Sequence, residues 1–552
     1  MAIYENSTGD DSLTAARPRR DRIDVGVLAG GQRFWALRSR CKRQPGRGLA
    51  AGEFRGSEAP GVEGGGLRSA PVPRQPVGYR IGGHGKRWGV SVGPVLWAVA
   101  LASCAPPEAG VPPRPNILLV SLDTVRADFL SPYSDGQWPT PTIQRLADDG
   151  IVFDHAVSSS PWTFPAHASL FTGLPVSVHG ARYDTRAEIG VAWHRVSLMD
   201  PRIPTLAEVL GEAGYHTAGA AAVVWLKEEY GLSRGFQQYV AEVDDIRGEP
   251  ADRMTDRGLQ LLQDRPLDRP FFQFLHYFDA HSPYTPPARH RPEGVDHDGS
   301  IAEVEARVNS GGTIGAEERA SLEALYGGEI RFVDEQLGRV VAYLEAQGLY
   351  DDTWIIVVAD HGESFGAHDF FGHGVVTWED VVHVPLIMKP PRSFSGRLGR
   401  HVATRVQAAE IVPTILDGLQ IERPAHVEGR NLLNVAGSRW KNDPRIVVTE
   451  VFRNLGMNRR FGSRWDRDVR SIYLGDHKLT VRSDGVVAVY DLAKDPGELH
   501  NRAAADLDRL DALSAELDQW LQWTGEHAYQ GRPAEIDTED AERLKALGYL
   551  GG

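Results

Sequence analysis

Two long apolar runs, far apart in the chain, each end in a carboxylate. Residues 116–123 read NILLVSLD and residues 353–363 read TWIIVVADHGE. Continuous apolar runs of this length are typical of strands that are buried on both faces of a parallel sheet. Such a sheet needs helices on both of its sides, so these two runs restrict the chain to an α/β architecture.

Other segments alternate with these strands. A helical pattern that closes at Gly214 and a further strand occupy 203–222, a strand that runs into a proline-rich loop occupies 270–287, and a long helix occupies 320–349. The alternation predicts an α/β sandwich, with a mostly parallel sheet between layers of helices. Polar residues just beyond the carboxyl ends of such strands line the ligand crevice. The residues at those positions are Asp123, His281, Asp360 and His361.

The C-terminal part has a different pattern. Two strand-like runs flank Ser-Asp-Gly within 470–492, which indicates a hairpin, and an amphipathic helix covers 504–523. We therefore expect a small α+β subdomain at 441–552, after a catalytic domain at 114–440.

The N-terminal part lacks the composition of a folded domain. Residues 1–76 are rich in Arg, Gly and Pro and show no sustained apolar periodicity. Such a segment cannot bury enough apolar surface to offset the entropy lost on ordering. We expect 1–84 to be disordered, or to be upstream sequence that the mature protein lacks. A basic arm that binds anionic surfaces is the functional alternative.

Residues 85–104 have the layout of a secretory signal. A positive pair precedes an apolar run that is too short to cross a bilayer comfortably, and the run ends in Leu-Ala-Ser-Cys. This ending and the proline-rich linker at 105–113 resemble a bacterial lipoprotein signal with Cys104 as the lipidated residue. We expect an extracytoplasmic protein that meets the membrane only through this anchor. A short buried helix with a chance cysteine is the alternative.

Charge and cysteine content exclude several classes of function. The formal net charge is −14, which argues against a nucleic-acid binder held by phosphate contacts. The two cysteines are Cys41 and Cys104, so the main body has no disulfide and no thiolate metal site. Any metal ion there must be held by carboxylate, imidazole or hydroxyl groups.

Asp123, Asp360 and His361 are candidate metal ligands. A carboxylate at a buried strand end is costly unless it is paired or bound to a cation, although each alone is more often a cap or turn residue. Neighbours on a regular strand point to opposite faces, so Asp360 and His361 share an ion only where the strand has ended, and the following glycine permits that turn. Two carboxylates and an imidazole suit Zn, Mn or Mg.

Thr163 opens a small-residue, helix-compatible run in SPWTFPAHASLFTG, residues 160–173. It is either the N-cap of that helix or a nucleophile. The two roles are compatible, because a helix N-terminus favours negative charge. A hydroxyl placed there and bound to a cation can ionise and attack phosphorus or sulfur.

Several separated motifs over 114–550 resemble the sulfatase family, part of the alkaline-phosphatase-like superfamily. They are RPNILLVSLDTVRADFL, TFPAHASLFTG, HYFDAHSPYTPP, VVADHGESFG, GHG, HVPLIMK and YDLAKDPGELHN, in family order. The resemblance implies an alkaline-phosphatase-like fold, with Asp123, Asp360 and His361 as metal ligands and Thr163 as the nucleophile that also touches the metal.

The same resemblance assigns further candidates. His167 follows where sulfatases usually carry an arginine near the nucleophile. His281 and His373 would contact the transferred group or protonate the leaving oxygen; outside this pattern, lone histidines are more often ordinary surface or core residues. Lys478 would lie near the pocket, or else be a surface lysine of the hairpin.

Two departures from the family pattern bear on the chemistry. Sulfatases carry Cys or Ser at the position of Thr163, which is oxidised to formylglycine, whereas oxidation of a threonine would give a ketone. The first metal strand of the family usually carries an Asp-Asp pair, and here Leu122 replaces the first member. The loss of one carboxylate shifts the expected ion from calcium toward Zn or Mn.

The resemblance and its departures together predict a metal-dependent hydrolase. It would cleave phosphate, phosphonate or sulfate esters of small molecules or polymers through a covalent threonine intermediate. The alternatives are an envelope phosphoglycerol- or phosphoethanolamine-type transferase, a true sulfuric ester hydrolase, and a non-catalytic envelope protein that retains the fold.

Overall fold

The computed structural model describes residues 26–27, 33–34 and 114–547, except 135, 185–194, 242, 244–247, 395–398, 426 and 438–444. The chain forms two compact units, Met1–Gly110 and Val111–Gly552. The first contains the antiparallel pair β1 (Gly26–Val27) and β2 (Arg33–Phe34). The predicted disorder of 1–84 otherwise lies outside the described residues, as do the signal at 85–104 and the linker at 105–113, so all three stay predictions.

An eight-stranded sheet forms the centre of the second unit. Its strands, in spatial order, are β16 (His401–Val402), β4 (Ile151–Phe153), β15 (Leu386–Lys389), β11 (Thr353–Ala359), β3 (Asn116–Leu122), β10 (Phe271–Tyr277), β8 (His216–Ala220) and β9 (Gln238–Val240). Strands β11, β3, β10, β8 and β9 run parallel to one another, and β15 is antiparallel to β11 and β4. The predicted α/β class with a mostly parallel sheet is confirmed.

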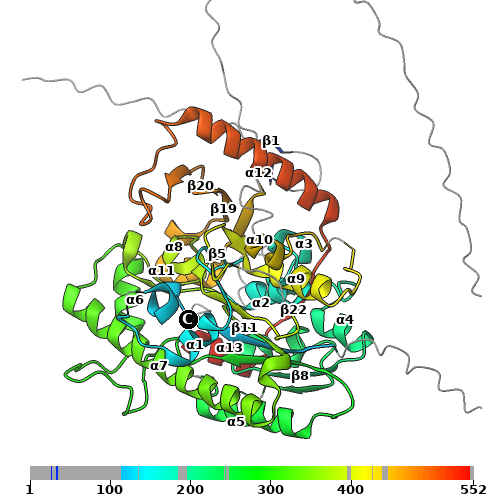
Figure 1. Cartoon of the computed structure of the whole chain (residues 1–552). Helices are drawn as coiled ribbons and strands as arrows, with labels where there is room; N and C mark the ends of the chain where they lie inside the picture. Colours follow the sequence, from blue (N-terminus) through cyan, green and yellow to red (C-terminus); the bar gives the residue numbers. More distant parts are fainter. Residues whose placement is uncertain are drawn as a thin grey trace, which may run out of the picture. The chain divides into compact units, whose positions relative to one another are not determined.

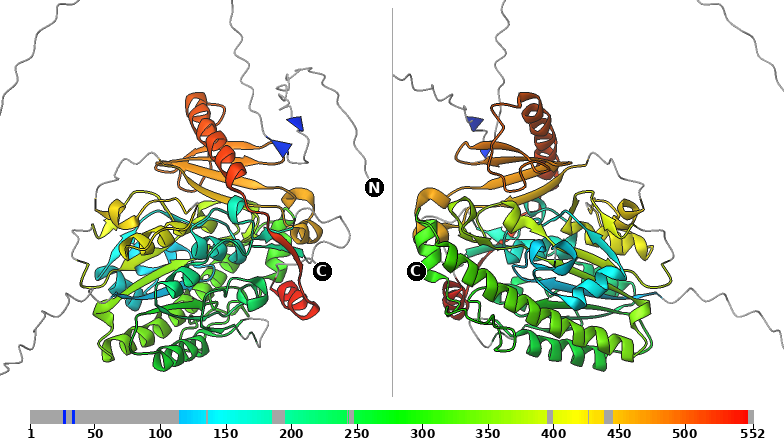
Figure 2. Two further views of the ribbon diagram at one scale, coloured as in Figure 1. Left: turned by 90° about the vertical axis from the view of Figure 1, so that its right-hand side faces the viewer. Right: turned by 60° about the vertical axis from the view of Figure 1, so that its left-hand side comes forward.

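Helices cover the sheet. They are α1 (Pro141–Asp148), α2 (Thr163–Thr172), α4 (Leu206–Glu212), α5 (Ala251–Asp264), α7 (Ala316–Ala346) and α9 (Ile411–Gly418). The long helices α5 and α7 lie side by side (Figures 1 and 2). Helix α4 starts at a capping box formed by Thr205 and Glu208, and the chain then turns into β8 through Gly214, whose φ of +91° favours glycine.

Parallel register sets the position of the candidate site. Leu122 pairs with both Tyr277 and Ala359, so β3, β10 and β11 end at the same level of the sheet. Asp123 and Asp360 are the next residues after β3 and β11, and both are buried. The carboxyl ends of the three central strands therefore bring distant parts of the chain together, as the sequence predicts.

Shorter elements surround this body. The strands are β5 (Ala156–Val157), β6 (Arg182–Tyr183), β7 (Arg195–Leu198), β12 (Ser364–Phe365), β13 (Phe371–Gly372), β14 (His383–Val384), β17 (Val406–Gln407) and β22 (Arg532–Glu535), and the helices are α3 (Val176–His179), α6 (Ala302–Asn309), α8 (Glu379–Val382), α10 (Leu432–Ala436), α11 (Leu455–Phe461) and α13 (Thr538–Ala546).

A second, antiparallel sheet contains β18 (Val447–Val451), β19 (Val469–Leu474), β20 (His477–Arg482) and β21 (Val487–Asp491). Helix α12 (Leu507–His527) lies against this sheet (Figure 1). Its Leu513 and Leu517 pack onto the sheet. The predicted turn at Ser-Asp-Gly joins β20 to β21, and the run before it is two strands rather than one. The predicted domain boundary at 440 falls in 438–444, outside the described residues. Among the described helices, none has the length and apolar character needed to cross a bilayer.

Candidate active site

The sequence-predicted metal ligands and nucleophile lie together at the end of the central strands. The Thr163 hydroxyl oxygen is 3.5 Å from Asp123 Oδ2 and 3.4 Å from His361 Nε2. Ligand atoms of Asp123, Asp360 and His361 all lie within 4.8 Å of one another. The four side chains are buried, so any charge they carry must be balanced within the site.

The residues fit a divalent cation. Burial raises the pKa of Asp123 to about 7. The pKa of Asp360 is also raised to about 7, mainly by burial and in addition by the negative charge of the nearby Asp123. Asp123 Oδ1 and Asp360 Oδ2 are buried with no hydrogen-bond partner in the described part of the chain. Two carboxylate oxygens without donors, side by side in the interior, are the arrangement that a bound cation stabilises.

His361 has the orientation of a metal-binding imidazole. Its Nδ1 lies 3.0 Å from the carbonyl oxygen of Gly362, which is only an acceptor, so Nδ1 carries the proton. Its Nε2 lone pair therefore faces Thr163 and Asp360. A backbone carbonyl that holds Nδ1–H is the usual way in which a protein fixes the tautomer of a histidine ligand.

His276, near the end of β10, is a site residue that the sequence reasoning missed. Its Nδ1 accepts the backbone N–H of Ala222 at 3.3 Å, so its proton is on Nε2. That nitrogen lies 3.1 Å from Asp123 Oδ2 and donates to it. His276 therefore holds Asp123 in place. A histidine inside a buried, mostly apolar strand was the signal that could have revealed it.

His167 is placed differently from the two predicted acid–base histidines. Its Nδ1 donates to the Thr163 carbonyl at 2.8 Å, and its Nε2 accepts from the Ser121 hydroxyl at 2.9 Å. Burial lowers its pKa to about 4, so the ring is neutral. Both nitrogens are engaged in fixing the first turn of α2 against β3.

His167, His276 and Asp360 form a second group with closely spaced ligand atoms. The lone pair of each imidazole in this group already accepts a hydrogen bond, from Ser121 in one case and from Ala222 in the other. An ion would have to break both bonds. The first group, with its two oxygens that lack donors, is the better metal site.

His281 and His373 lie together beside the metal group. Their ring centroids are 5.1 Å apart, and that of His373 is 4.5 Å from that of His361. The Nδ1 atoms face acceptors, the Ser282 carbonyl at 2.8 Å and Glu363 Oε1 at 3.1 Å. Burial lowers the pKa of both histidines to about 3, so both are neutral at pH 7.

Glu363 is a further residue that was not predicted, although it stands in the DHGE motif. It is fully buried, and burial raises its pKa to about 7. A cavity of about 30 Å³ lies beside Glu363 and His373, and Trp162 and Asn454 contribute to its wall. This volume is room for about one water-sized group next to the catalytic candidates.

The structure excludes one of the two interpretations that the sequence leaves open for Thr163, and one of the two for Lys478. Trp162 occupies the N-cap of α2, and Thr163 is the first helical residue, so the cap interpretation of Thr163 is wrong. Lys478 is fully buried, so it is not a surface lysine. Its ammonium pairs with Glu498 at 2.8 Å and Glu379 at 3.1 Å, in an ion-pair network at the C-terminal sheet.

Comparisons with known proteins agree with this geometry. The sulfatase family profile matches residues 115–421, more than half of the chain. An uncharacterised sulfatase of Escherichia coli K12, YidJ, is 26% identical over 439 residues, 70% of this chain and 83% of that protein. The multifunctional alkaline phosphatase superfamily protein PehA of Trinickia caryophylli is 28% identical over 519 residues, 77% of this chain and 99% of that one.

A solved structure supports the fold. The phosphonate monoester hydrolase of Agrobacterium radiobacter superposes with a TM-score of 0.59 at 23% identity, over 76% of this chain and 99% of that one. The family profile covers more than half of the chain. The strand-end carboxylates and the helix that starts at Thr163 lie within the matched residues. This chain belongs to the sulfatase family of ester-cleaving enzymes.

Proposed function

We propose that this family member is a metal-dependent hydrolase that cleaves phosphate or phosphonate esters with Thr163 as its nucleophile. One observation carries the proposal: the Thr163 hydroxyl lies at the start of α2, within 3.5 Å of both Asp123 and His361. A helix N-terminus stabilises developing negative charge on that oxygen.

Asp123, Asp360, His361 and the Thr163 hydroxyl would hold a divalent ion of the Zn, Mn or Mg type. Such an ion, when bound, supplies charge that favours the ionised hydroxyl and the anionic transition state. His276 keeps Asp123 oriented, and His167 keeps the first turn of α2 in register with β3.

The positions of these side chains support a two-step reaction. The Thr163 hydroxyl gives up its proton to one of the nearby histidines as its oxygen forms a bond to phosphorus, and the ester oxygen leaves with the bonding electron pair and takes up a proton. Water then attacks the same phosphorus, the bond to Thr163 breaks, and the threonine hydroxyl is restored. His281 and His373 lie beside the metal group, where they would bind the transferred group and relay these protons.

The nucleophile favours phosphorus over sulfur. The names of the relatives include both a sulfatase and a phosphonate monoester hydrolase, so family membership does not choose between the two elements. Threonine, in contrast, cannot become the formylglycine aldehyde. We therefore place direct attack by the hydroxyl ahead of attack by an aldehyde hydrate.

The test is a panel of p-nitrophenyl sulfate, p-nitrophenyl phosphate, bis-p-nitrophenyl phosphate and p-nitrophenyl phenylphosphonate with Zn or Mn. The expected result is fastest cleavage of a phosphorus ester and loss of about 10⁴-fold or more in kcat for Thr163→Ala. Intact mass after rapid quenching should show a phenylphosphonyl adduct on wild type and none on Thr163→Ala.

Three results would contradict parts of the proposal. Full activity of Thr163→Ala would remove the nucleophile, and cleavage restricted to the aryl sulfate would remove the preference for phosphorus. Product that forms only when an alcohol acceptor is added would indicate a transferase instead of a hydrolase.

A further inference from the structure

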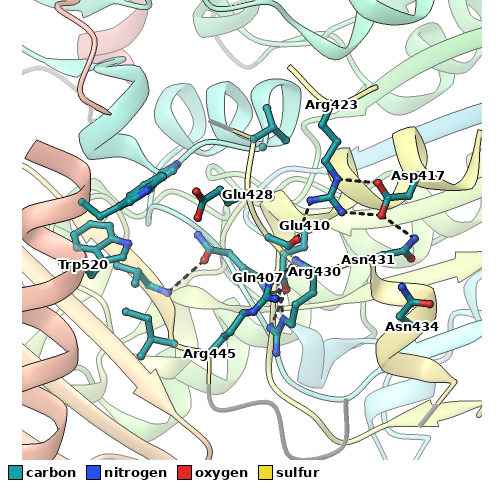
Figure 3. A pocket seen from close by; sticks show the side chains of 18 of the residues that line it. Gln407, Glu410, Asp417, Arg423, Glu428, Arg430, Asn431, Asn434, Arg445 and Trp520 are labelled. Atoms are coloured by element: carbon teal, nitrogen blue, oxygen red, sulfur yellow. Dashed lines mark hydrogen bonds and ion pairs between the residues drawn. The ribbon is translucent and has the colours of Figure 1, made fainter. Parts of the chain in front are cut away.

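A large cavity lies apart from the catalytic centre. It has a volume of about 840 Å³ and lies between the region of α9, residues 423 and 427–434, and helix α12 (Figure 3). Helix α2 links the two places, because Thr163 begins it and Gly173, at its end, lines the cavity. At a rise of 1.5 Å per residue, the ten residues of α2 separate them by about 15 Å.

One wall of the cavity is held rigid by forked ion pairs. Arg430 donates from Nε and Nη2 to the two carboxylate oxygens of Glu410, each at 2.8 Å, and both residues are buried. Arg423 makes the same two-pronged contact with Asp417, at 2.8 and 2.7 Å, and Asn431 adds a bond to Asp417. Bidentate pairs fix planar groups at defined angles, so this wall is preorganised.

The charge of the lining does not suit an anion. Three arginines and four carboxylates line the cavity, and two of the arginines are paired with carboxylates of the wall itself. Glu428 and Glu516 add further negative charge to the lining. A phosphate, a sulfate or a nucleotide would need an excess of cationic donors, which this cavity does not supply.

Aromatic rings form the opposite wall. Trp520 and Trp523 are three residues apart on α12, so both face the same side of the helix, and both are half-buried. Trp523 stacks on His527 with 4.9 Å between ring centroids, which fixes its plane. Figure 3 shows Trp520 across the cavity from Asp417 and Asn434.

The two walls suit a ligand with an apolar face and many hydroxyl groups. Indole rings offer large flat apolar surfaces, against which the C–H face of a sugar ring packs. Carboxylates accept hydrogen bonds from hydroxyls, guanidinium groups donate to them, and amides do both. A volume of about 840 Å³ falls in the range of sites that enclose a ligand of this size.

We propose that this cavity binds an uncharged carbohydrate segment, as a non-catalytic site that holds a glycan about 15 Å from the catalytic threonine. The site goes beyond the ester chemistry and does not depend on it. Trp520 and Trp523 supply the stacking surface, and Glu428, Asn434 and Arg445 supply contacts to hydroxyls at the exposed rim.

The experiment screens the full chain on an array of neutral and sulfated glycans and then titrates the neutral hits in solution. We expect binding of a neutral glycan with a Kd of the order of 1 mM or tighter. We expect Trp520→Ala to weaken it by about tenfold or more, because stacking on the indole is lost. Gln522→Ala, exposed on α12 and outside the cavity lining, is the matched control and should bind as wild type does.

Two further measurements distinguish the possible outcomes, namely the salt dependence of glycan binding and glycan binding by Thr163→Ala. Binding of a neutral glycan should stay constant between about 0.05 and 0.5 M salt, since no charges are paired. Thr163→Ala should bind the glycan with unchanged affinity even if it abolishes ester cleavage, so the two proposals fail independently. The inference is overturned if no neutral glycan binds more tightly to wild type than to Trp520→Ala. Preferential, salt-sensitive binding of sulfated glycans at this cavity would also overturn it.

Discussion

Replacing His276 tests the tautomer argument for the metal site. In His276→Ala, Asp123 loses the donor that lies 3.1 Å from its Oδ2. The bond is buried, so no solvent replaces it, and loss of such an outer partner lowers metal affinity by about 10- to 100-fold. This corresponds to about 1.4–2.8 kcal/mol of binding free energy.

The same substitution has a separate effect on folding. The backbone N–H of Ala222 loses its acceptor, which costs about 1–3 kcal/mol in a buried position. His179→Ala is the matched control, because His179 is also buried and its Nδ1 also accepts a backbone N–H, that of Ala181, at 3.0 Å. It should lower the free energy of unfolding to a similar extent and leave metal affinity unchanged.

The assay is a titration of Zn²⁺ against a chromophoric chelator, with urea unfolding measured in parallel. His276→Gln, whose amide can still donate to Asp123, should recover part of the lost affinity. Wild-type affinity in His276→Ala would refute the positioning role. A drop in the number of bound Zn²⁺ ions would also refute the positioning role, because it would show that His276 is itself a metal ligand.

Three further predictions concern stability and location. Burial and, to a lesser extent, the neighbouring Asp279 carboxylate raise the pKa of Glu329 to about 9. Between about pH 5 and 8 the folded state therefore keeps a proton that the unfolded state has lost. The free energy of unfolding should fall with rising pH in this range, by up to about 1.4 kcal/mol per pH unit. Glu329→Gln should flatten that slope in urea unfolding, and parallel curves for the two proteins would contradict the assignment. Lys478→Met leaves the buried Glu498 and the partly buried Glu379 without their ammonium partner and should cost about 3–5 kcal/mol in the same measurement. A loss below about 1 kcal/mol would show that the network does not depend on the lysine. We also propose that Cys104 carries a lipid anchor, so Cys104→Ser should abolish palmitate labelling and move the protein from the membrane to the soluble fraction, whereas a variant that stays membrane-bound would exclude the anchor.

The sequence revealed the central sheet and most of the candidate site because their signals are local. A buried strand shows itself as an apolar run, and the residue after it lies at the sheet edge by geometry alone. Asp123, Asp360 and His361 could therefore be named as neighbours before any contact was known. Thr163 could be named as a possible nucleophile from the sequence. The competing N-cap interpretation could be excluded only from the structure, in which Trp162 is the N-cap.

Other properties depend on groups that approach from distant parts of the chain. The tautomer of His276 is set by the backbone N–H of Ala222, which follows β8 and is 54 residues away in sequence. The charge of the buried Lys478 is balanced by Glu379 and Glu498, which belong to other segments of the chain. No periodicity encodes which donor faces which acceptor, so these assignments needed the structure.

The sequence by itself determined the α/β class, the strand-end candidates for metal ligands and the presence of a hydroxyl where the family carries an oxidisable residue. These follow from hydrophobic periodicity and residue chemistry, which act over a few positions. Only the tertiary structure decided three features. His276 donates to Asp123, and His167 donates to the Thr163 carbonyl in the first turn of α2. Helix α12 and Arg430 line the same cavity. Hydrogen-bond direction and enclosed volume are properties of packed surfaces, and those exist only once the chain has folded.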